Sequence, residues 1–247
     1  MVSNRMREED LPIMESPITR NNVLQLLVPK PNPVILDLGA NEGQSTREFL
    51  ELYPEAIIHA FEPAPDTFVK LQKNIGDKPN VTLVNQAIGA KTGMATFHIN
   101  SYDQTSSLLP LTPDGPYVRR NVAPKEEIEV NVTTLDDYAV KAEMEHVNFC
   151  KIDTQGCSRT TLEGARNLLD SERIDVLQVE LLFAHFYQRN ESFSDIEAAL
   201  GKGYRFYTLI ATDNHHVGEA YVNHRTGETM HVDALYVRQG ISATSGE

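Results

Sequence analysis

A glycine-containing turn after a short apolar run is the first place where this sequence could do chemistry. The run is Val34-Ile35-Leu36, and the turn is Asp37-Leu-Gly39-Ala-Asn41-Glu-Gly43. Glycine lets the backbone approach a bound molecule closely. A second apolar run, residues 57–61, ends at Glu62. A carboxylate one strand further along can accept hydrogen bonds from both hydroxyls of a ribose. Together the two segments predict a site for a nucleoside-containing cofactor.

The spacing within the turn argues against a nicotinamide dinucleotide. The dinucleotide fingerprint is G-x-G-x-x-G, with the pyrophosphate at the helix N-terminus. Here Asn41 takes the middle glycine position, and no third glycine follows at the required spacing. Asp37 and Glu42 are poor neighbours for a phosphate, whereas a carboxylate suits a ligand with an ammonium group. S-adenosylmethionine has an ammonium, a sulfonium and a ribose but no phosphate, so it is the predicted cofactor. The alternative is an ordinary strand–turn–helix connection without a ligand.

Composition limits the classes of partner. The chain has 247 residues, 22 Lys and Arg against 35 Asp and Glu, and a net charge of −13. Nucleic acids and anionic membranes call for a basic surface, so neither is an expected partner. The sequence shows no apolar signal-peptide core and no stretch near about 18 apolar residues, which favours a cytoplasmic protein. The two cysteines, Cys150 and Cys157, do not suggest a disulfide framework.

Alternating strand-like and helix-like segments predict an α/β fold. Such alternation gives a doubly wound, mostly parallel sheet with helices on both faces. Main-sheet strands are expected at 34–38, 57–61, 81–84, 147–152, 176–182, 204–210 and 234–237. Helices are expected from Ser16-Pro17 to Pro29 and at 44–53, 66–75, 134–138, 160–169 and 193–200. The predicted division is an N-terminal segment with one helix (1–32), a main domain (33–238) and a flexible tail (239–247).

Several segments outside this alternation carry separate expectations. Residues 93–99 are predicted to form part of a hairpin, and alternation at 128–132 predicts an edge strand with one wet face. Residues 101–125 form a long, proline-rich loop, and loops of this length often serve as lids or binding segments. Thr226-Gly227 is predicted to be a turn.

Polar residues at the predicted strand ends point to one shared site. Ligands in parallel sheets bind beyond the carboxyl ends of the strands. The residues at or just after these ends are Asp37, Glu62, Asn85, Asp153 and Glu180. Their common placement supports a single site at one edge of the sheet.

An ordered set of short motifs resembles the FkbM-type methyltransferases. The motifs are Asp37-Leu-Gly-Ala-Asn-Glu-Gly43, Phe61-Glu62-Pro63, Asn85-Gln-Ala-Ile-Gly89, Ser106-Ser107-Leu108, Thr134-Leu135-Asp136, Lys151-Ile-Asp153-Thr-Gln-Gly156, Leu162-Glu-Gly-Ala165 and Asp233-Ala-Leu-Tyr-Val237. The resemblance covers about residues 33–238. It implies a class I, Rossmann-like methyltransferase fold, with a seven-stranded sheet whose last strand is antiparallel. It also implies S-adenosylmethionine as cofactor and methylation of a small molecule or sugar, most often at oxygen.

The resemblance also assigns cofactor-binding residues. The turn from Gly39 to Gly43 would line the methionine part, and Glu62 would bind the ribose. Residues 86 and 87 would border the adenine. Apart from the resemblance, Ser106 and Ser107 of the long loop are expected to close over the cofactor, with a role only in forming the turn as the alternative. The full expected set is Asp37, Gly39, Ala40, Asn41, Gly43, Gln44, Ser45, Glu62, Pro63, Gln86, Ala87, Ser107 and Asp153. One departure concerns Cys157-Ser158-Arg159, because the family usually has an acidic residue two positions past the glycine equivalent to Gly156.

Three residues are candidates for the chemistry of transfer. An alcohol acceptor must be aligned with the methyl group and must lose its proton. Asp153 is expected to orient the acceptor or take its proton, with contact to the cofactor ammonium alone as the alternative. His185, just beyond a strand, is a second candidate base, and packing in its apolar surroundings is the alternative. Glu180 is expected to bind the acceptor or to be a satisfied buried carboxylate.

No metal site is predicted. The spacings of a histidine-rich stretch match no zinc pattern, and its residues are expected to be exposed in a hairpin. This stretch contains His215, His216, His224, His231 and Asp233. A divalent cation at Asp153, Glu180 and His185 is the minority interpretation.

An O-methyltransferase is therefore the leading hypothesis for the function. A cofactor-binding protein without transfer activity is the first alternative, because of the departure at Cys157-Ser158-Arg159. A nicotinamide-dependent oxidoreductase is the second. The expected partners are a small-molecule or sugar acceptor and, optionally, a second copy of the chain.

Overall fold

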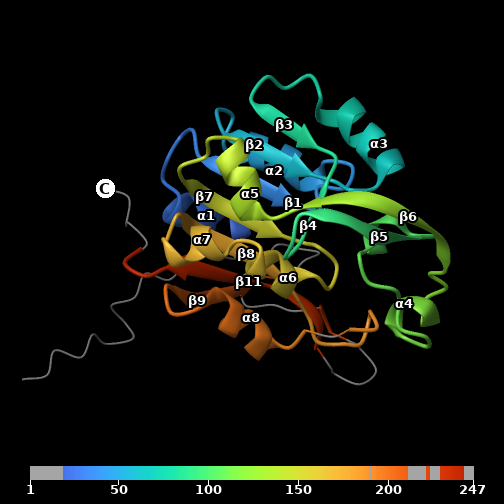
Figure 1. The fold of residues 1–247 in the computed structure, drawn as a ribbon. Coiled ribbons are helices and arrows are strands. Elements are labelled where there is room, and N and C mark those ends of the chain that lie inside the picture. Colours follow the sequence, from blue (N-terminus) through green and yellow to red (C-terminus); the bar gives the residue numbers. More distant parts are fainter. Residues whose placement is uncertain (1–18, 190, 211–220, 223–228, 242–247) are drawn as a thin grey trace, which may run out of the picture.

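A mostly parallel eight-stranded sheet forms the centre of the molecule (Figure 1). The computed structural model describes residues 19–189, 191–210, 221–222 and 229–241. The strand order is β10-β11-β8-β7-β1-β2-β3, and β9 also pairs with β11. The strands are β1 (Val34–Leu38), β2 (Ile57–Phe61), β3 (Val81–Val84), β7 (Val147–Ile152), β8 (Ile174–Leu182), β9 (Tyr204–Ile210), β10 (Tyr221–Val222) and β11 (Thr229–Arg238).

Strand direction confirms the predicted topology. β1 pairs in parallel with β2 and β7, and β7 pairs in parallel with β8. The last strand, β11, runs antiparallel to β8 and β9. Apart from the short β10, this is the predicted seven-stranded sheet with its last strand antiparallel.

Helices cover both faces of the sheet, as predicted. On one face, α1 (Arg20–Leu27) and α2 (Gln44–Leu52) bury Leu24 and Phe49 against Ile35 and Phe149. α3 (Pro65–Ile75) packs over β2. The opposite face carries α5 (Leu135–Lys141), α6 (Ser158–Glu163), α7 (Arg166–Asp170) and α8 (Phe193–Leu200). Because α1 shares a core cluster with the strands, the N-terminal helix packs as part of the main fold.

Two predicted helices have different limits in the structure. The first begins at Arg20, where the Thr19 side chain accepts a hydrogen bond from the Asn22 N–H as a cap, and Ser16-Pro17 lies outside the described residues. The predicted helix 160–169 is two helices, α6 and α7, separated at Gly164. A Cβ added to Gly164 would lie 2.1 Å from the Gly89 carbonyl oxygen. Close contact with the neighbouring chain therefore favours glycine at this break.

A separate three-stranded sheet was not predicted as such. It consists of β4 (Ala87–Ile88), β6 (Pro124–Thr133) and β5 (Gly93–Asn100) in that order. The antiparallel pairing of β5 with β6 confirms the predicted hairpin. The edge-strand prediction for 128–132 is confirmed for residues 128–131, which pair with β5 alone, and was wrong at residue 132, where β4 pairs with the other side of β6. One face of β6 is nevertheless wet, since Glu127 and Glu129 are exposed.

The long segment 101–125 folds back over the carboxyl ends of the main strands. It contains a 3₁₀ turn, η2 (Asp103–Thr105), and the short helix α4 (Pro116–Arg119). Bridges join Ser107 to β5 and Leu111 to Tyr187. The Tyr187 hydroxyl also donates to the Thr105 carbonyl at 2.9 Å. These contacts make the segment a wall beside the sheet edge where ligands bind.

Two further features of the fold concern the length of the helices and the state of the cysteines. Within the described part of the chain, the helices are all too short or too polar to cross a bilayer. Cys150 and Cys157 are buried free thiols. The predicted turn at Thr226-Gly227 lies outside the described residues.

Candidate active site

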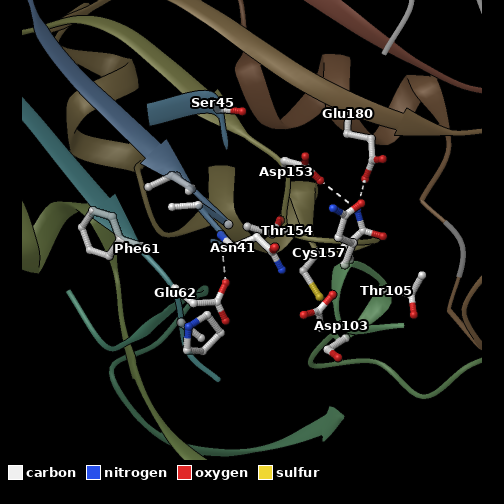
Figure 2. A pocket seen from close by; sticks show the side chains of 18 of the residues that line it. Asn41, Ser45, Phe61, Glu62, Asp103, Thr105, Asp153, Thr154, Cys157 and Glu180 are labelled. Carbon is white, nitrogen blue, oxygen red and sulfur yellow. Dashed lines mark hydrogen bonds between the residues drawn. The ribbon is translucent and has the colours of Figure 1, made fainter. Parts of the chain in front are cut away.

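A cavity of about 440 Å³ lies beyond the carboxyl ends of the central strands. One side is formed by the turn after β1 and the end of β2, and the other by the residues after β7 and at the end of β8 (Figure 2). The segment 102–108 closes part of its rim. The predicted site residues that line it are Gly39, Ala40, Asn41, Gln44, Ser45, Glu62, Pro63, Gln86, Ala87, Asp153 and Glu180.

The glycine turn is shaped by contact with the neighbouring strand. Gly39 has φ +83°, and a Cβ there would lie 2.0 Å from the Asp153 carbonyl oxygen, so a larger residue does not fit. The turn donates its backbone N–H groups to protein acceptors rather than into the cavity. These donors are Gly39 and Ala40 to the Phe61 carbonyl, Asn41 to Glu62, and Gly43 to the Ala40 carbonyl. N–H groups used in this way do not cradle a phosphate, which agrees with the sequence argument against a dinucleotide.

Asp37 and Gly43, both predicted to bind the cofactor, do not line the cavity. Asp37 is fully buried and accepts a hydrogen bond from the Thr46 hydroxyl of α2 at 2.7 Å. Gly43 has φ +92°, and a Cβ there would lie 2.6 Å from Ile75 of α3. These two residues therefore lie behind the turn, in contact with α2 and α3, and not in the cavity lining.

Glu62 faces the cavity with its orientation fixed by the backbone (Figure 2). Its Oε1 accepts from the Ala64 N–H at 2.8 Å, and its Oε2 accepts from the Asn41 N–H at 3.1 Å. Burial, and to a smaller extent the nearby carboxylates of Asp103 and Asp37, raise the pKa of Glu62 to about 7 despite these two hydrogen bonds. A ligand that donates hydrogen bonds to Glu62 would favour the ionised carboxylate and would therefore lower this pKa.

Lys151 links Asp153 to the buried Asp37. Lys151 Nζ lies 3.0 Å from Asp153 Oδ2 and 3.7 Å from Asp37 Oδ1. Burial alone would raise the pKa of Asp153, but Lys151 and hydrogen bonding hold it below its usual value. Burial likewise opposes the charge of Lys151, but Asp153 and Asp37 together raise its pKa above the usual value. Asp153 is thus an ionised carboxylate inside the cavity at neutral pH.

The Gln155 amide joins the two predicted acceptor-side carboxyl groups. Its Nε2 donates to Asp153 Oδ1 at 2.8 Å and to Glu180 Oε2 at 3.1 Å (Figure 2). Its Oε1 accepts from the hydroxyls of Tyr187 and Tyr117 at 2.8 and 3.3 Å. Burial, and then the charge of Asp153, raise the pKa of Glu180 well above its usual value. Of these two carboxyl groups, Glu180 is therefore the one that holds a proton more readily.

Two other predicted residues lie away from the cavity lining. His185 is exposed and does not line the cavity, so the set Asp153, Glu180 and His185 does not come together. The Ser107 hydroxyl donates to the Gln155 carbonyl at 2.7 Å, and Ser107 is buried within the wall. Its neighbours Ser106 and Leu108 line the cavity instead.

Sequence reasoning did not assign roles to Lys151, Gln155 or Asp233. Lys151 and Gln155 line the cavity, and Asp233 is 4% exposed with a 2.7 Å hydrogen bond from Gln178. The expectation that Asp233 is an exposed hairpin residue was therefore wrong, because β11 is an inner strand. The spacing of Lys151 and Asp153 could have indicated a role for Lys151, because polar residues two apart at the end of a strand point to the same face of the sheet. His215, His216 and His224 lie outside the described residues.

The segment Cys157-Ser158-Arg159, where the sequence departs from the family pattern, lies at the start of α6 beside the cavity. The Ser158 hydroxyl donates to the Glu180 carbonyl at 3.2 Å, and Cys157 lines the cavity with its pKa raised by burial to about 12. The backbone N–H of Arg159 donates a hydrogen bond to Glu191 Oε2 at 2.8 Å. A carboxylate from a different segment thus contacts the start of α6, where the sequence itself has no acidic residue.

Comparison with known proteins identifies the family. Residues 37–206 match the model of the methyltransferase FkbM domain. This chain belongs to the FkbM methyltransferase family. The 2-O-methyltransferase NoeI of Sinorhizobium fredii is 29% identical over 153 residues, which are 60% of this chain and 63% of NoeI. The 31-O-demethyl-FK506 methyltransferase FkbM of Streptomyces tacrolimicus is 24% identical over 205 residues, 74% of this chain and 76% of the relative.

A solved structure shows the same fold for this FkbM-family chain. The crystal structure of methyltransferase FkbM from Methylobacillus flagellatus superposes with a TM-score of 0.50 at 14% identity, over 83% of this chain and 44% of the other. The match to NoeI spans less than two thirds of that relative's length. The comparisons therefore establish family and fold.

Proposed function

We propose that this chain is an S-adenosylmethionine-dependent methyltransferase that acts on a hydroxyl group of a small molecule or sugar. The observation that carries the proposal is one cavity that extends from Glu62 to the Lys151–Asp153 pair. The first end suits a ribose, and the second holds an ionised carboxylate where an acceptor hydroxyl can be oriented. The names of two relatives, a 2-O-methyltransferase and a 31-O-demethyl-FK506 methyltransferase, support oxygen as the methylated atom.

The residues around the cavity fit the proposed cofactor. Glu62 has a fixed carboxylate that can accept both ribose hydroxyls. The turn from Gly39 to Asn41 offers a surface for the methionine part but no free phosphate cradle. Gln86 and Ala87 lie on the side assigned to the adenine. When bound, S-adenosylmethionine supplies a methyl group already activated by its sulfonium.

The chain's own residues would supply alignment and proton transfer. Asp153, held ionised by Lys151, accepts a hydrogen bond from the acceptor hydroxyl and orients its oxygen toward the methyl group. Gln155 fixes the carboxyl group of Asp153 against that of Glu180. Residues 102–106 and 108, which belong to the wall, line part of the same cavity. Alignment of this kind can contribute up to about 7–11 kcal/mol to lowering the barrier.

The proposal is tested by ligand-induced stabilisation followed by a transfer assay. S-adenosylhomocysteine should raise the melting temperature of the wild type, and Glu62→Ala should abolish that shift. Methyl transfer from radiolabelled S-adenosylmethionine is then measured across a panel of hydroxylated small molecules and sugars. The absence of any melting shift at saturating ligand would refute cofactor binding. A shift without transfer to any acceptor would support the alternative of a binding protein.

A further inference from the structure

Three carboxyl groups lie in one row across neighbouring strands: Asp153 and Glu180 line the cavity, and Asp233 is buried beside Glu180. Glu180 on β8 is the direct partner of Asp233 on β11. Asp153 follows Ile152, whose partner on β8 is Val179, so it continues the same register toward Glu180. Partners in register share a face of the sheet. Asp153, Glu180 and Asp233 therefore form what we call the acidic row.

A second row of polar residues lies next to the acidic row on the same face of the sheet and contacts it. Asp37 pairs with Lys151, and Lys151 pairs with Gln178. The Lys151 ammonium contacts Asp153 of the acidic row at 3.0 Å and also faces Asp37 at 3.7 Å. The Gln178 amide donates to Asp233 Oδ2 at 2.7 Å. One ammonium thus faces two carboxylates, which leaves it little capacity to balance further ionisation in the acidic row. The buried guanidinium of Arg20 lowers the pKa of Asp233, but it is itself paired with Glu48.

Like charges this close disfavour ionisation of all three groups together. Gln155 bridges Asp153 and Glu180 with a single amide nitrogen, at 2.8 and 3.1 Å. From the segments packed above, the hydroxyls of Tyr117 and Tyr187 reach the other end of this amide. Burial raises the pKa of both phenols, so they remain neutral. His231 of β11 also lines the cavity.

We propose that the acidic row is a charge-balancing proton store, which holds a proton on Glu180 in the free protein and releases it when a cationic cofactor binds. This inference rests on the proposed function, because it needs S-adenosylmethionine in the cavity. The positive sulfonium would balance the second ionised carboxylate, so that Glu180 becomes a carboxylate in the loaded site. A thioether ligand, which lacks that charge, would leave the proton in place.

The store would then take back one proton in each transfer. The acceptor oxygen forms its bond to the methyl carbon, and the carbon–sulfur bond breaks with its electron pair left on sulfur. The O–H bond of the acceptor breaks at the same time, and Glu180 receives its proton, directly or by way of Asp153. The positive charge at the cofactor disappears in the same step in which the acidic row loses one negative charge.

The ionisation of the individual groups agrees with this role. Burial, then the charges of Asp153 and Asp233, raise the pKa of Glu180 well above its usual value. Burial raises the pKa of Asp233 to about 6, with Asp153 as the next contribution. Asp153 is held below its usual value by Lys151 and its hydrogen bonds, against the effect of burial. The stored proton is therefore assigned to Glu180.

The test counts protons on binding and needs no acceptor. Calorimetric titrations with S-adenosylmethionine and with S-adenosylhomocysteine are run near neutral pH in buffers of different ionisation enthalpy. The wild type should release more protons with the first ligand than with the second, by up to about one proton per site. Glu180→Gln, which retains an oxygen to accept from Gln155, should abolish this difference. Glu191→Gln is the matched control, because burial also raises the pKa of Glu191, here to about 7, and Glu191 does not line the cavity that Asp153 and Glu180 both line.

Each outcome decides the inference. Equal proton release with the two ligands, both binding, overturns the proton store and leaves the proposed function intact. A difference that persists in Glu180→Gln overturns the assignment to the acidic row. Binding heat from neither ligand overturns the proposed function and this inference with it. If Glu180→Gln does not fold, Asp233→Asn should reduce the difference, since it removes a charge that keeps Glu180 protonated, and an unchanged difference would refute the proposal.

Discussion

The affinity of this cavity for S-adenosylhomocysteine should depend on pH through Glu62. The pKa of Glu62 is raised to about 7, first of all by burial, so near neutral pH the group exists in both forms. Ribose hydroxyls donate more strongly to a carboxylate than to a neutral carboxyl group, by about 1 kcal/mol or more. We therefore expect the ligand to bind chiefly the ionised form, and its affinity to rise with pH.

The size of the effect follows from the fraction of ionised Glu62. With a pKa of about 7, that fraction is about one eleventh at a pH of about 6 and about ten elevenths at a pH of about 8. The dissociation constant should therefore fall by up to about tenfold between these two conditions, the full change being reached when the ligand binds only the ionised form. The free energy of unfolding of the ligand-free protein should show the opposite trend and fall as pH rises, because a carboxyl group whose pKa is raised in the fold costs stability once it ionises. From the usual value of 4.5 to about 7, this cost amounts to about 3 kcal/mol, developed as pH rises through that interval.

The assay is calorimetric titration of S-adenosylhomocysteine across this pH range. The thioether ligand is chosen because it lacks the sulfonium that would act on the carboxyl groups at the other end of the cavity. Glu62→Gln should bind more weakly with an almost flat pH profile, whereas Glu191→Gln should retain the tenfold change. A wild-type affinity that varies less than about twofold, or a tenfold change that survives in Glu62→Gln, would refute the reasoning.

Three further changes test the surrounding structure. Lys151→Met leaves the Asp153 carboxylate without its ammonium and should lower the free energy of unfolding in urea by about 3–5 kcal/mol. Gly43→Ala, where an added Cβ would lie 2.6 Å from a carbon of α3, should cost about 1–3 kcal/mol in the same measurement, whereas Gly203→Ala, with no contact nearer than 3.5 Å, should cost much less. Gln155→Leu removes the amide donor to two carboxyl groups and should slow methyl transfer, measured with any acceptor found, while the affinity for S-adenosylhomocysteine stays within about threefold.

The parts of the fold that depend on local pattern could be predicted from the sequence. β1, β2 and the carboxylate at Glu62 follow from short apolar runs bounded by glycine and proline, and the structure places Glu62 in the cavity. The antiparallel direction of the last strand was accessible only through the family resemblance, and the order of the strands was not predicted, because strand neighbours depend on contacts between distant segments. β6 shows this directly, since its alternation is typical of a half-wet strand but does not reveal that β4 pairs beside it.

The site itself was only partly predictable, because the sequence does not show which strands pair or toward which helix a polar side chain points. Asp37 shares its face of the sheet with Ile35, which packs under α2, so alternation along β1 directs its carboxylate toward that helix and away from a ligand. Lys151 and Asp233 acquire their roles through pairing between strands that are far apart in sequence. His185 follows a strand as a base might, but the chain after β8 places it on the surface.

A crystal structure of the wild-type protein with S-adenosylhomocysteine tests the central claim most directly. The account predicts that the ligand occupies the cavity, with its ribose hydroxyls within hydrogen-bond distance of Glu62 and its sulfur on the side of Asp153. An empty cavity at saturating ligand would contradict the account. So would a ligand bound there with its ribose away from Glu62.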